Sequence, residues 1–184
     1  MFFFRDKGAA SGLIEVISKV ILLFILCLGL AQGNENLEYK IKAAYLYNFT
    51  KFISWPEKNT PTFNICIVGT DPFQNLLDSL ETKTAAGKPI RIFRYTNPVQ
   101  MVDCHIVYFG DTTSDYPIAT FSVNGSLSVS SRPKFAESGG MIGFVLEDQK
   151  IKLHINLKAV KKAGLSMSAK LIEVSTLVEG DGDE

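Results

Sequence analysis

Residues 63–73 read FNICIVGTDPF, and this stretch decides the fold class. The apolar run Phe63–Val68 predicts a strand, and the following GTDP predicts a turn into a helix that reaches about Lys83. Asp71 is suited to cap that helix, and Pro72 is suited to its first position. A strand that turns directly into a helix is the repeating unit of α/β folds.

Three further strands are expected downstream. They are Ile90–Tyr95, Cys104–Phe109 and Ser126–Ser130. Cys104–Phe109 is apolar without alternation, which is typical of a strand buried on both faces. With a short helix expected around Tyr116–Phe121, strands and helices alternate, and this alternation favours a mostly parallel sheet with helices on both faces.

The closing part of the chain has a different pattern. Met141–Leu146 and Ile151–Ile155 flank the polar turn EDQK, which predicts an antiparallel hairpin. A helix over Leu157–Ala163 follows, starting at Asn156 or a neighbour and broken by Gly164.

A final helix is expected to reach about Leu177, with Ser166 or Ser168 as its cap. Upstream of the first strand, Glu35–Ser54 carries apolar residues at spacings of three and four, which predicts an amphipathic helix ended by Trp55-Pro56. The whole pattern predicts a three-layer α/β/α sandwich. Its sheet is mixed and mostly parallel, with a C-terminal antiparallel hairpin, and the first helix packs on one face.

The N-terminus reads as a secretory signal peptide, residues 1–31. An apolar run of twelve residues, Val20–Ala31, follows basic residues and spans only about 18 Å, short of the roughly 30 Å that a bilayer core requires. Small residues at Gly29 and Ala31 suggest cleavage before Gln32. The alternative is an uncleaved anchor, which would place Glu15 and Lys19 in lipid. A lipid anchor on Cys27 is not expected, because leucine precedes it.

Residues 32–179 are then expected to form one domain in an exported, periplasmic protein, with residues 180–184 as a disordered acidic tail. The full chain has 19 basic and 19 acidic residues, and removing the leader leaves 16 and 17. Such a balance gives no excess positive field for nucleic acid, which is not expected as a partner. The mature chain keeps two cysteines, Cys66 and Cys104, which predict either a disulfide or two buried thiols.

No catalytic centre emerges from the residue types and their spacing. His105 and His154 each lie in a strand-like segment without a second ligand nearby, which favours structural roles over a metal site. A nucleophile elbow and a C-x-x-C pair are both missing from the sequence. The chain is therefore expected to be no enzyme and to use no cofactor and no metal.

Two glycine-containing loops are candidate ligand sites. Gly69 and Asp71 precede a predicted helix N-terminus, where backbone N–H groups attract anions, although capping alone explains the turn. Gly139 and Gly140 could bring backbone close to a ligand, or supply the bend before a strand.

Aromatic residues are dense between positions 45 and 55. Most lie on the apolar stripe of the predicted first helix and are expected in the core. Tyr47 and Trp55 lie off that stripe, which makes them candidates for an exposed patch that contacts a partner protein.

Taken in order, several segments of the mature chain resemble the YfiR-like family of periplasmic regulators. They are KAAYLYNFTKFISWP (42–56), GTDPF (69–73), DCHIVYF (103–109), SLSVSS (126–131), GGMIGF (139–144), INL (155–157) and AGLSMSAKLI (163–172). The resemblance implies a Rossmann-like, non-catalytic domain that forms dimers and has a disulfide between Cys66 and Cys104. Relatives repress a membrane-bound diguanylate cyclase and so restrain cyclic-di-GMP signalling and biofilm formation. The second cysteine pair of some relatives is missing here.

Two functions follow as hypotheses. In the first, a periplasmic homodimer binds the external part of a membrane signalling protein, such as a diguanylate cyclase, and restrains it. In the alternative, the domain senses a small molecule between the Gly69 loop and the Gly139-Gly140 turn and passes the signal to a sensor kinase.

Overall fold

The structure, a computed structural model, describes residues 18–19, 37–98, 101, 103–111 and 125–180. The chain divides into two units, residues 1–38 and residues 39–184. Apart from Ser18 and Lys19, the predicted signal peptide lies outside the described residues, as does the short helix expected around Tyr116–Phe121. Among the described residues, no helix is both long and apolar enough to cross a bilayer.

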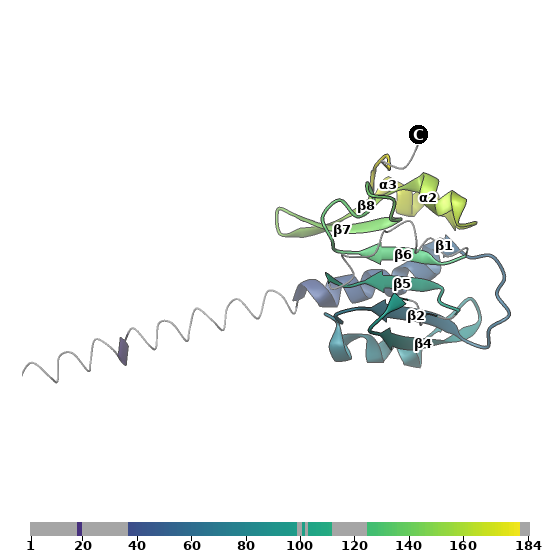
Figure 1. The fold of residues 1–184 in the computed structure, drawn as a ribbon, viewed down its shortest axis with the longest axis horizontal. Helices are drawn as coiled ribbons and strands as arrows, with labels where there is room; N and C mark the ends of the chain where they lie inside the picture. The colour runs from purple at the N-terminus through teal and green to yellow at the C-terminus, as the bar shows by residue number, and fades with distance from the viewer. Residues whose placement is uncertain (1–17, 20–36, 99–100, 102, 112–124, 181–184) are drawn as a thin grey trace, which may run out of the picture. The chain divides into compact units, whose positions relative to one another are not determined.

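The larger unit is built on an eight-stranded sheet with the order β10-β8-β7-β6-β5-β2-β4-β3 (Figure 1). Its strands are β2 (Phe63–Val68), β3 (Thr84–Ala85), β4 (Lys88–Tyr95), β5 (Ile106–Phe109), β6 (Leu127–Ser130), β7 (Ile142–Glu147), β8 (Lys150–Ile155) and β10 (Thr176–Leu177). Strands β4, β2, β5, β6 and β7 run parallel, whereas β7 and β8 form the antiparallel hairpin. The predicted mixed, mostly parallel sheet with a closing hairpin is confirmed.

Four helical segments accompany the sheet among the described residues. Residues 37–52 are helical, and 39–52, here called the first helix, belong to the larger unit. The others are η1 (Gln74–Thr82), α2 (Leu157–Lys162) and α3 (Ala169–Glu173). The predicted caps at Asn156 and Ser168 are present, because each side chain accepts a hydrogen bond from a backbone N–H in the first turn of its helix.

The first helix ends two residues earlier than predicted. Ile53 and Ser54 instead form strand β1 (Ile53–Ser54), which pairs antiparallel with β9 (Ser166–Met167). Ile53 pairs with Met167, and beside this pair the Ser168 N–H donates to the Phe52 carbonyl. These contacts satisfy the backbone hydrogen-bonding groups that a longer helix would have paired internally. The partner strand lies far along the chain, so local sequence patterns do not reveal it.

Two other predicted helices differ from the structure. The helix after Pro72 is a 3-10 helix, not an α-helix. The final helix stops at Glu173, because Thr176 and Leu177 pair with β8 as the edge strand β10. A hydrogen bond from the Val178 N–H to the Ile155 carbonyl extends this pairing.

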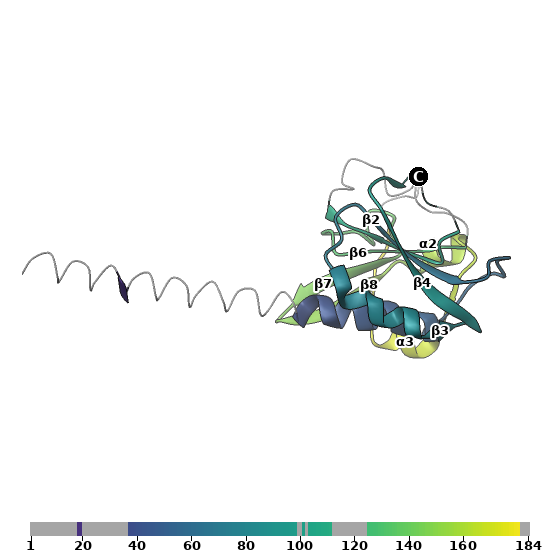
Figure 2. The same ribbon diagram turned by 90° about the horizontal axis from the view of Figure 1, so that it is seen from below.

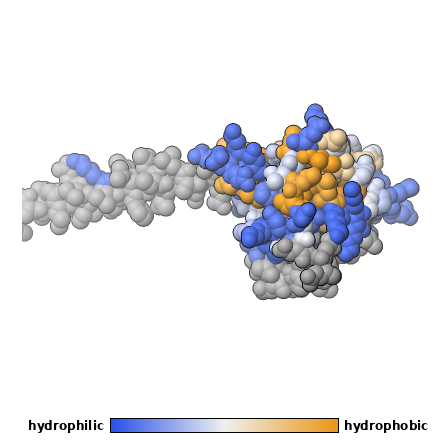
Figure 3. Space-filling model, turned by 90° about the horizontal axis from the view of Figure 1, so that it is seen from above, coloured by the Kyte–Doolittle hydropathy of each residue, from blue (hydrophilic) through white to orange (hydrophobic). Residues whose placement is uncertain are grey.

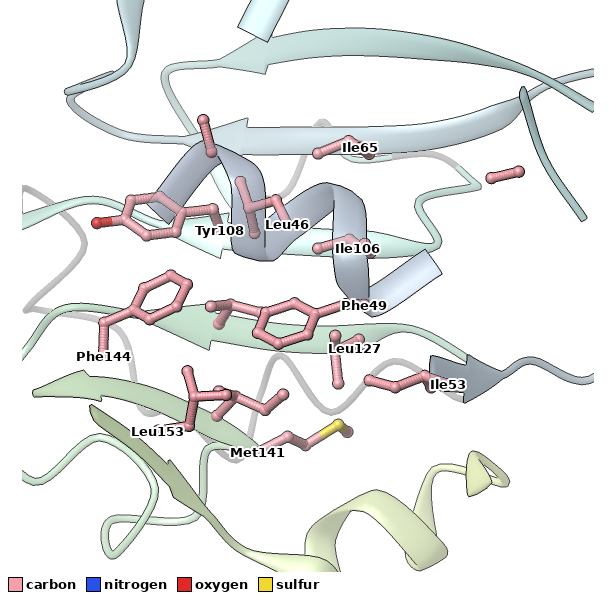
Figure 4. Packing of buried hydrophobic residues seen from close by; sticks show 14 of the residues in the cluster. Leu46, Phe49, Ile53, Ile65, Ile106, Tyr108, Leu127, Met141, Phe144 and Leu153 are labelled. Atoms are coloured by element: carbon pink, nitrogen blue, oxygen red, sulfur yellow. The ribbon is translucent and has the colours of Figure 1, made fainter. Parts of the chain in front are cut away.

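The core lies on the face of the sheet that the helices cover. Figure 2 shows the first helix and η1 on the same side of the sheet, and Figure 4 shows Leu46 and Phe49 pointing from the first helix toward the strands. Both side chains are fully buried, and the Phe49 ring stacks on Phe144 of β7 at 6.1 Å. Burial of each such side chain contributes about 1.5–3 kcal/mol, so this helix is fixed to the sheet by its apolar stripe.

The opposite face of the sheet carries a smaller cluster built around a disulfide. Cys66 of β2 and Cys104, which precedes β5, are bonded, with their Cα atoms 5.9 Å apart. Phe109 and Phe135 pack in the same cluster, and the turns over residues 132–138 supply Phe135. No described helix contributes a buried side chain to this cluster, so the second helical layer of the three-layer sandwich stays a prediction.

Reduction of the disulfide is expected to lower the free energy of unfolding by about 4 kcal/mol, because the bond closes a loop of 38 residues in the unfolded chain. Denaturant titration with and without a reducing agent measures the difference. A Cys66→Ala/Cys104→Ala double variant is the control and should not respond to the reducing agent. Equal stability of the oxidised and reduced wild-type protein would contradict this expectation.

Candidate functional site

Tyr47 and Trp55 do not form one exposed patch, which corrects the sequence-based expectation. Both side chains are only partly exposed and pack against the main core. They line two separate hollows that share no residue. The first helix projects Tyr47 to one side, and the chain that leaves this helix through β1 carries Trp55 to the other hollow.

The Tyr47 groove is a hollow of about 260 Å³ between the first helix and η1. It is lined by Lys40, Ala43, Ala44, Tyr47, Asn48, Leu76, Ser79, Leu80 and Lys83. The Lys51 ammonium lies 4.4 Å and the Lys83 ammonium 5.2 Å from the centre of the Tyr47 ring. The two cations are suited to attract an acidic segment of a partner protein. The ring itself is suited to a protein contact, because aromatic residues are enriched at interfaces.

The Trp55 hollow has a volume of about 380 Å³ and lies next to strands β1, β2 and β4. It is lined by Thr50, Ile53, Ser54, Trp55, Pro56, Glu57, Lys58, Phe63, Ala86, Lys88 and His105. The indole of Trp55 is held in place, because its Nε1 donates to the His105 carbonyl at 2.8 Å and its ring meets Phe63 edge-on at 5.0 Å. Trp55 is therefore a fixed wall of the hollow rather than a free surface residue.

Two lysines of the Trp55 hollow are held by neutral groups. The Lys58 ammonium donates to the Cys104 carbonyl at 2.5 Å and to Ser126 Oγ at 3.2 Å. Lys88 donates to the Lys58 carbonyl at 2.7 Å. Burial lowers the pKa of Lys58, and the nearby charge of Asp103 offsets part of that effect. Neither ammonium forms an ion pair with a carboxylate of the described residues.

His105 completes this hollow and is a neutral donor at physiological pH. Its Nδ1 accepts a hydrogen bond from the Asn64 N–H at 3.0 Å, which places the ring proton on Nε2. The ring stacks on Phe63 at 4.4 Å, and the residue is only 4% exposed. Burial, together with the smaller effects of the Lys58 and Lys88 charges, lowers the pKa of His105 to about 4, although the charge of Asp103 acts in the opposite direction.

We expect the protein to lose about 2 kcal/mol of stability between pH 8 and pH 5 through His105. The unfolded chain protonates this residue near pH 6.5, whereas the folded chain does so only near pH 4, so acidification favours unfolding in that window. The measurement is denaturant titration of the wild type and of a His105→Gln variant between pH 5 and pH 8. The difference between the two proteins isolates the contribution of His105 to the pH dependence, because both contain His154. A variant that retains the full pH dependence would argue against a neutral His105.

The Gly69 loop is held by hydrogen bonds of Asp71, whose Oδ1 accepts from the backbone N–H groups of Phe73 at 2.8 Å and Gln74 at 3.2 Å. The N-cap of η1 is nevertheless Phe73 and the helix begins at Gln74, so the predicted positions of Asp71 as cap and Pro72 as first helical residue were wrong by two residues. The other carboxylate oxygen of Asp71 pairs with Arg94 Nε at 2.7 Å, and this hydrogen bond raises the pKa of Arg94. The Gly69 N–H donates to the Tyr95 carbonyl. These contacts leave ligand binding by Gly69 and Asp71 without support.

Gly139 and Gly140 serve the backbone and the packing of the second face. Gly139 has φ +96°, which glycine adopts readily, and the Gly140 N–H donates to the Phe135 carbonyl. A Cβ at Gly140 would meet the ring of Phe135. The hollows described here are lined by none of the four candidate residues Gly69, Asp71, Gly139 and Gly140. Ligand binding between the two loops stays a prediction.

Gly140→Ala should therefore destabilise the protein by about 1–3 kcal/mol, because the new methyl group would overlap Phe135, which is itself fixed against Phe109. Gly143→Ala is the matched control, since its Cβ would have no neighbour closer than 3.7 Å. Thermal or denaturant unfolding of both variants makes the comparison. Equal stability of the two would show that the close packing at Gly140 is not required.

His154 lies between two carboxylates on the second face. Its Nδ1 lies 3.2 Å from Glu137 Oε1, and its Nε2 lies 3.4 Å from Glu147 Oε1. The two carboxylates face opposite nitrogens of the ring, so they do not converge on one metal position. No group of three metal-binding side chains occurs within the described ranges. His154 thus links the turns over residues 132–138 to the hairpin, in agreement with a structural role.

A third hollow lies beside the edge strand β10 and has a volume of about 750 Å³. It is lined by Asn156, Leu157, Lys158, Leu177, Val178, Glu179 and Gly180. Figure 3 shows apolar side chains gathered on the side of the molecule that carries α2 and α3. Val174 and Leu177, which follow α3 in the chain, are 69% and 50% exposed.

The sequence did not single out Lys58 and Lys88. Each is an isolated lysine near a turn, and only the order of the strands brings them to Trp55 and His105. The WPEK segment that carries Trp55 and Lys58 would have been a weak indication of a mixed aromatic and basic site.

The fold and its contacts define a mixed α/β domain in which a disulfide joins β2 to the segment just before the neighbouring parallel strand β5, and the helices pack on one face. A model of the YfiR/HmsC-like family matches residues 39–176, which is most of the chain. The chain therefore belongs to the YfiR/HmsC-like family, as its sequence segments predicted. None of the curated proteins matches the chain significantly.

Proposed function

We propose that this protein is a non-catalytic periplasmic regulator that binds the external part of a membrane signalling protein and restrains it. The partner we favour is a diguanylate cyclase, so that the protein limits cyclic-di-GMP and biofilm formation. In this proposal residues 1–31 are a cleaved signal peptide, residues 32–179 form the domain, and two copies form a homodimer. Family membership over residues 39–176 is the observation that carries the proposal.

Several features support export and binding. The Cys66–Cys104 disulfide is suited to the oxidising periplasm, where such bonds persist. It is buried between β2 and β5, so it stabilises the sheet and is not displayed for exchange with other thiols. The histidines of the described residues have structural partners, namely Asn64 for His105 and the glutamates for His154. These features agree with a protein that acts through its surface.

The Tyr47 groove is our candidate for the partner contact, with Trp55 as a second, less accessible candidate. The groove offers an aromatic ring, small side chains from the first helix, and cations at its rim. It would take an apolar side chain flanked by acidic residues of the partner. Regulation requires that this contact be tighter in the inactive state of the partner than in its active state.

Deletion of the gene should raise cellular cyclic-di-GMP, and the full-length protein should restore the original level. Tyr47→Ala should fail to restore it, because loss of a central aromatic contact weakens binding by about 2 kcal/mol, or thirtyfold. Trp55→Ala is expected to have a smaller effect. The measurement is the cyclic-di-GMP content of cells that contain equal amounts of each variant in the periplasm.

Two controls make the result specific. Tyr95→Ala removes a partly exposed tyrosine on the opposite face of the sheet and should restore the original level. A protein that lacks residues 1–31 should remain in the cytoplasm and should not restore it. An unchanged cyclic-di-GMP level after deletion would exclude a cyclase as partner. Full activity of the protein without its leader would exclude periplasmic action.

A further inference from the structure

We propose that the Trp55 hollow binds a small organic anion, one that carries a carboxylate or another oxyanion on an apolar, ring-sized body. The proposal is independent of the partner contact at Tyr47, because the two hollows share no lining residue. It also concerns a different place from the Gly69 and Gly139-Gly140 loops.

The first argument is an open hydrogen-bond donor in a buried residue. His105 Nδ1 accepts from Asn64, so the proton lies on Nε2, and no described residue accepts it. Every fully buried side-chain nitrogen or oxygen of the described residues has a hydrogen-bond partner. Because Nε2 has no such partner, it is accessible to solvent. His105 is 4% exposed and lines the hollow, which is therefore the route to Nε2. An oxygen of a ligand there would accept this hydrogen bond.

The second argument is the charge of the lining. Lys58 and Lys88 contribute two positive charges and Glu57 one negative charge, which leaves one positive charge in excess. Lys58 and Lys88 both act electrostatically on His105, so both cations lie close to the open donor, and Asp103, which is not part of the lining, opposes them with a smaller effect. Their ammonium groups are held by neutral oxygens, and burial disfavours the charged form of Lys58. An anion in the hollow would compensate for that unfavourable burial.

The third argument is the shape and the apolar walls. Trp55 and Phe63 meet edge-on, and both line the hollow together with Ile53, Pro56 and Ala86. A volume of about 380 Å³ lies within the range of small-molecule sites, roughly 300–1,000 Å³. Because the indole is fixed by its hydrogen bond to the His105 carbonyl, a flat ligand would meet a preformed wall. These walls favour an organic anion over a bare inorganic one.

The fluorescence of Trp55 provides a direct test, since Trp55 is the only tryptophan of the chain. The purified protein at pH 7.5 is titrated with benzoate, with phenyl phosphate and with benzyl alcohol, a neutral molecule of similar size. We expect a saturable change in fluorescence with at least one of the two anions, and at least about tenfold weaker binding of the alcohol. The stronger of the two anions identifies the preferred oxyanion.

Variants connect the signal to the proposed donors. Lys88→Met should weaken binding of the preferred anion about tenfold or more, because it removes a charge-assisted hydrogen bond. Lys152→Met removes the same charge from β8, outside the hollow, and should bind like the wild type. If Lys88→Met does not fold, Lys88→Gln gives the same comparison with a polar side chain.

Three results would overturn the proposal. One is the lack of any saturable change with either anion, and another is equal binding of benzyl alcohol. The third is wild-type affinity in both Lys88→Met and Lys88→Gln.

Discussion

The packing of the first helix on the sheet is the constraint on which the rest of the structure depends. Leu46 and Phe49 insert into the large core cluster, where Phe49 stacks on Phe144 of the hairpin. Once this stripe is buried, the flank of the helix that carries Tyr47 must face η1. The end of the helix must also deliver the chain to β1 and Trp55. Both candidate sites are therefore consequences of how one amphipathic helix is oriented.

The order of the parallel strands is the second determinant. Because β2 lies between β4 and β5, residues near the starts of these strands meet at one edge of the sheet. Lys88 begins β4, His105 precedes β5, and Lys58 reaches the Cys104 carbonyl from the segment before β2. The same neighbourhood of β2 and β5 allows Cys66 and Cys104 to bond. A disulfide and a positively charged hollow thus share one topological origin.

Local sequence patterns predicted the elements whose causes are local. The bounds of Phe63–Val68 were correct, because an apolar run is followed there by a clear turn, and the caps at Asn156 and Ser168 follow from side-chain chemistry. The short strands β1, β9 and β10 were missed, because each exists only through pairing with a distant segment. Tyr47 and Trp55 are both partly buried against the main core. Their separation into two hollows depends on tertiary packing that periodicity does not contain.

In the function proposed above, the Tyr47 groove contacts the membrane partner, and crosslinking in living cells tests this proposal most directly. A photoreactive amino acid at position 47 is predicted to form an adduct with an inner-membrane protein that carries a cyclase domain, whereas the same group at position 95 is not. An adduct from position 95 alone, or the same products from both positions, would contradict the account.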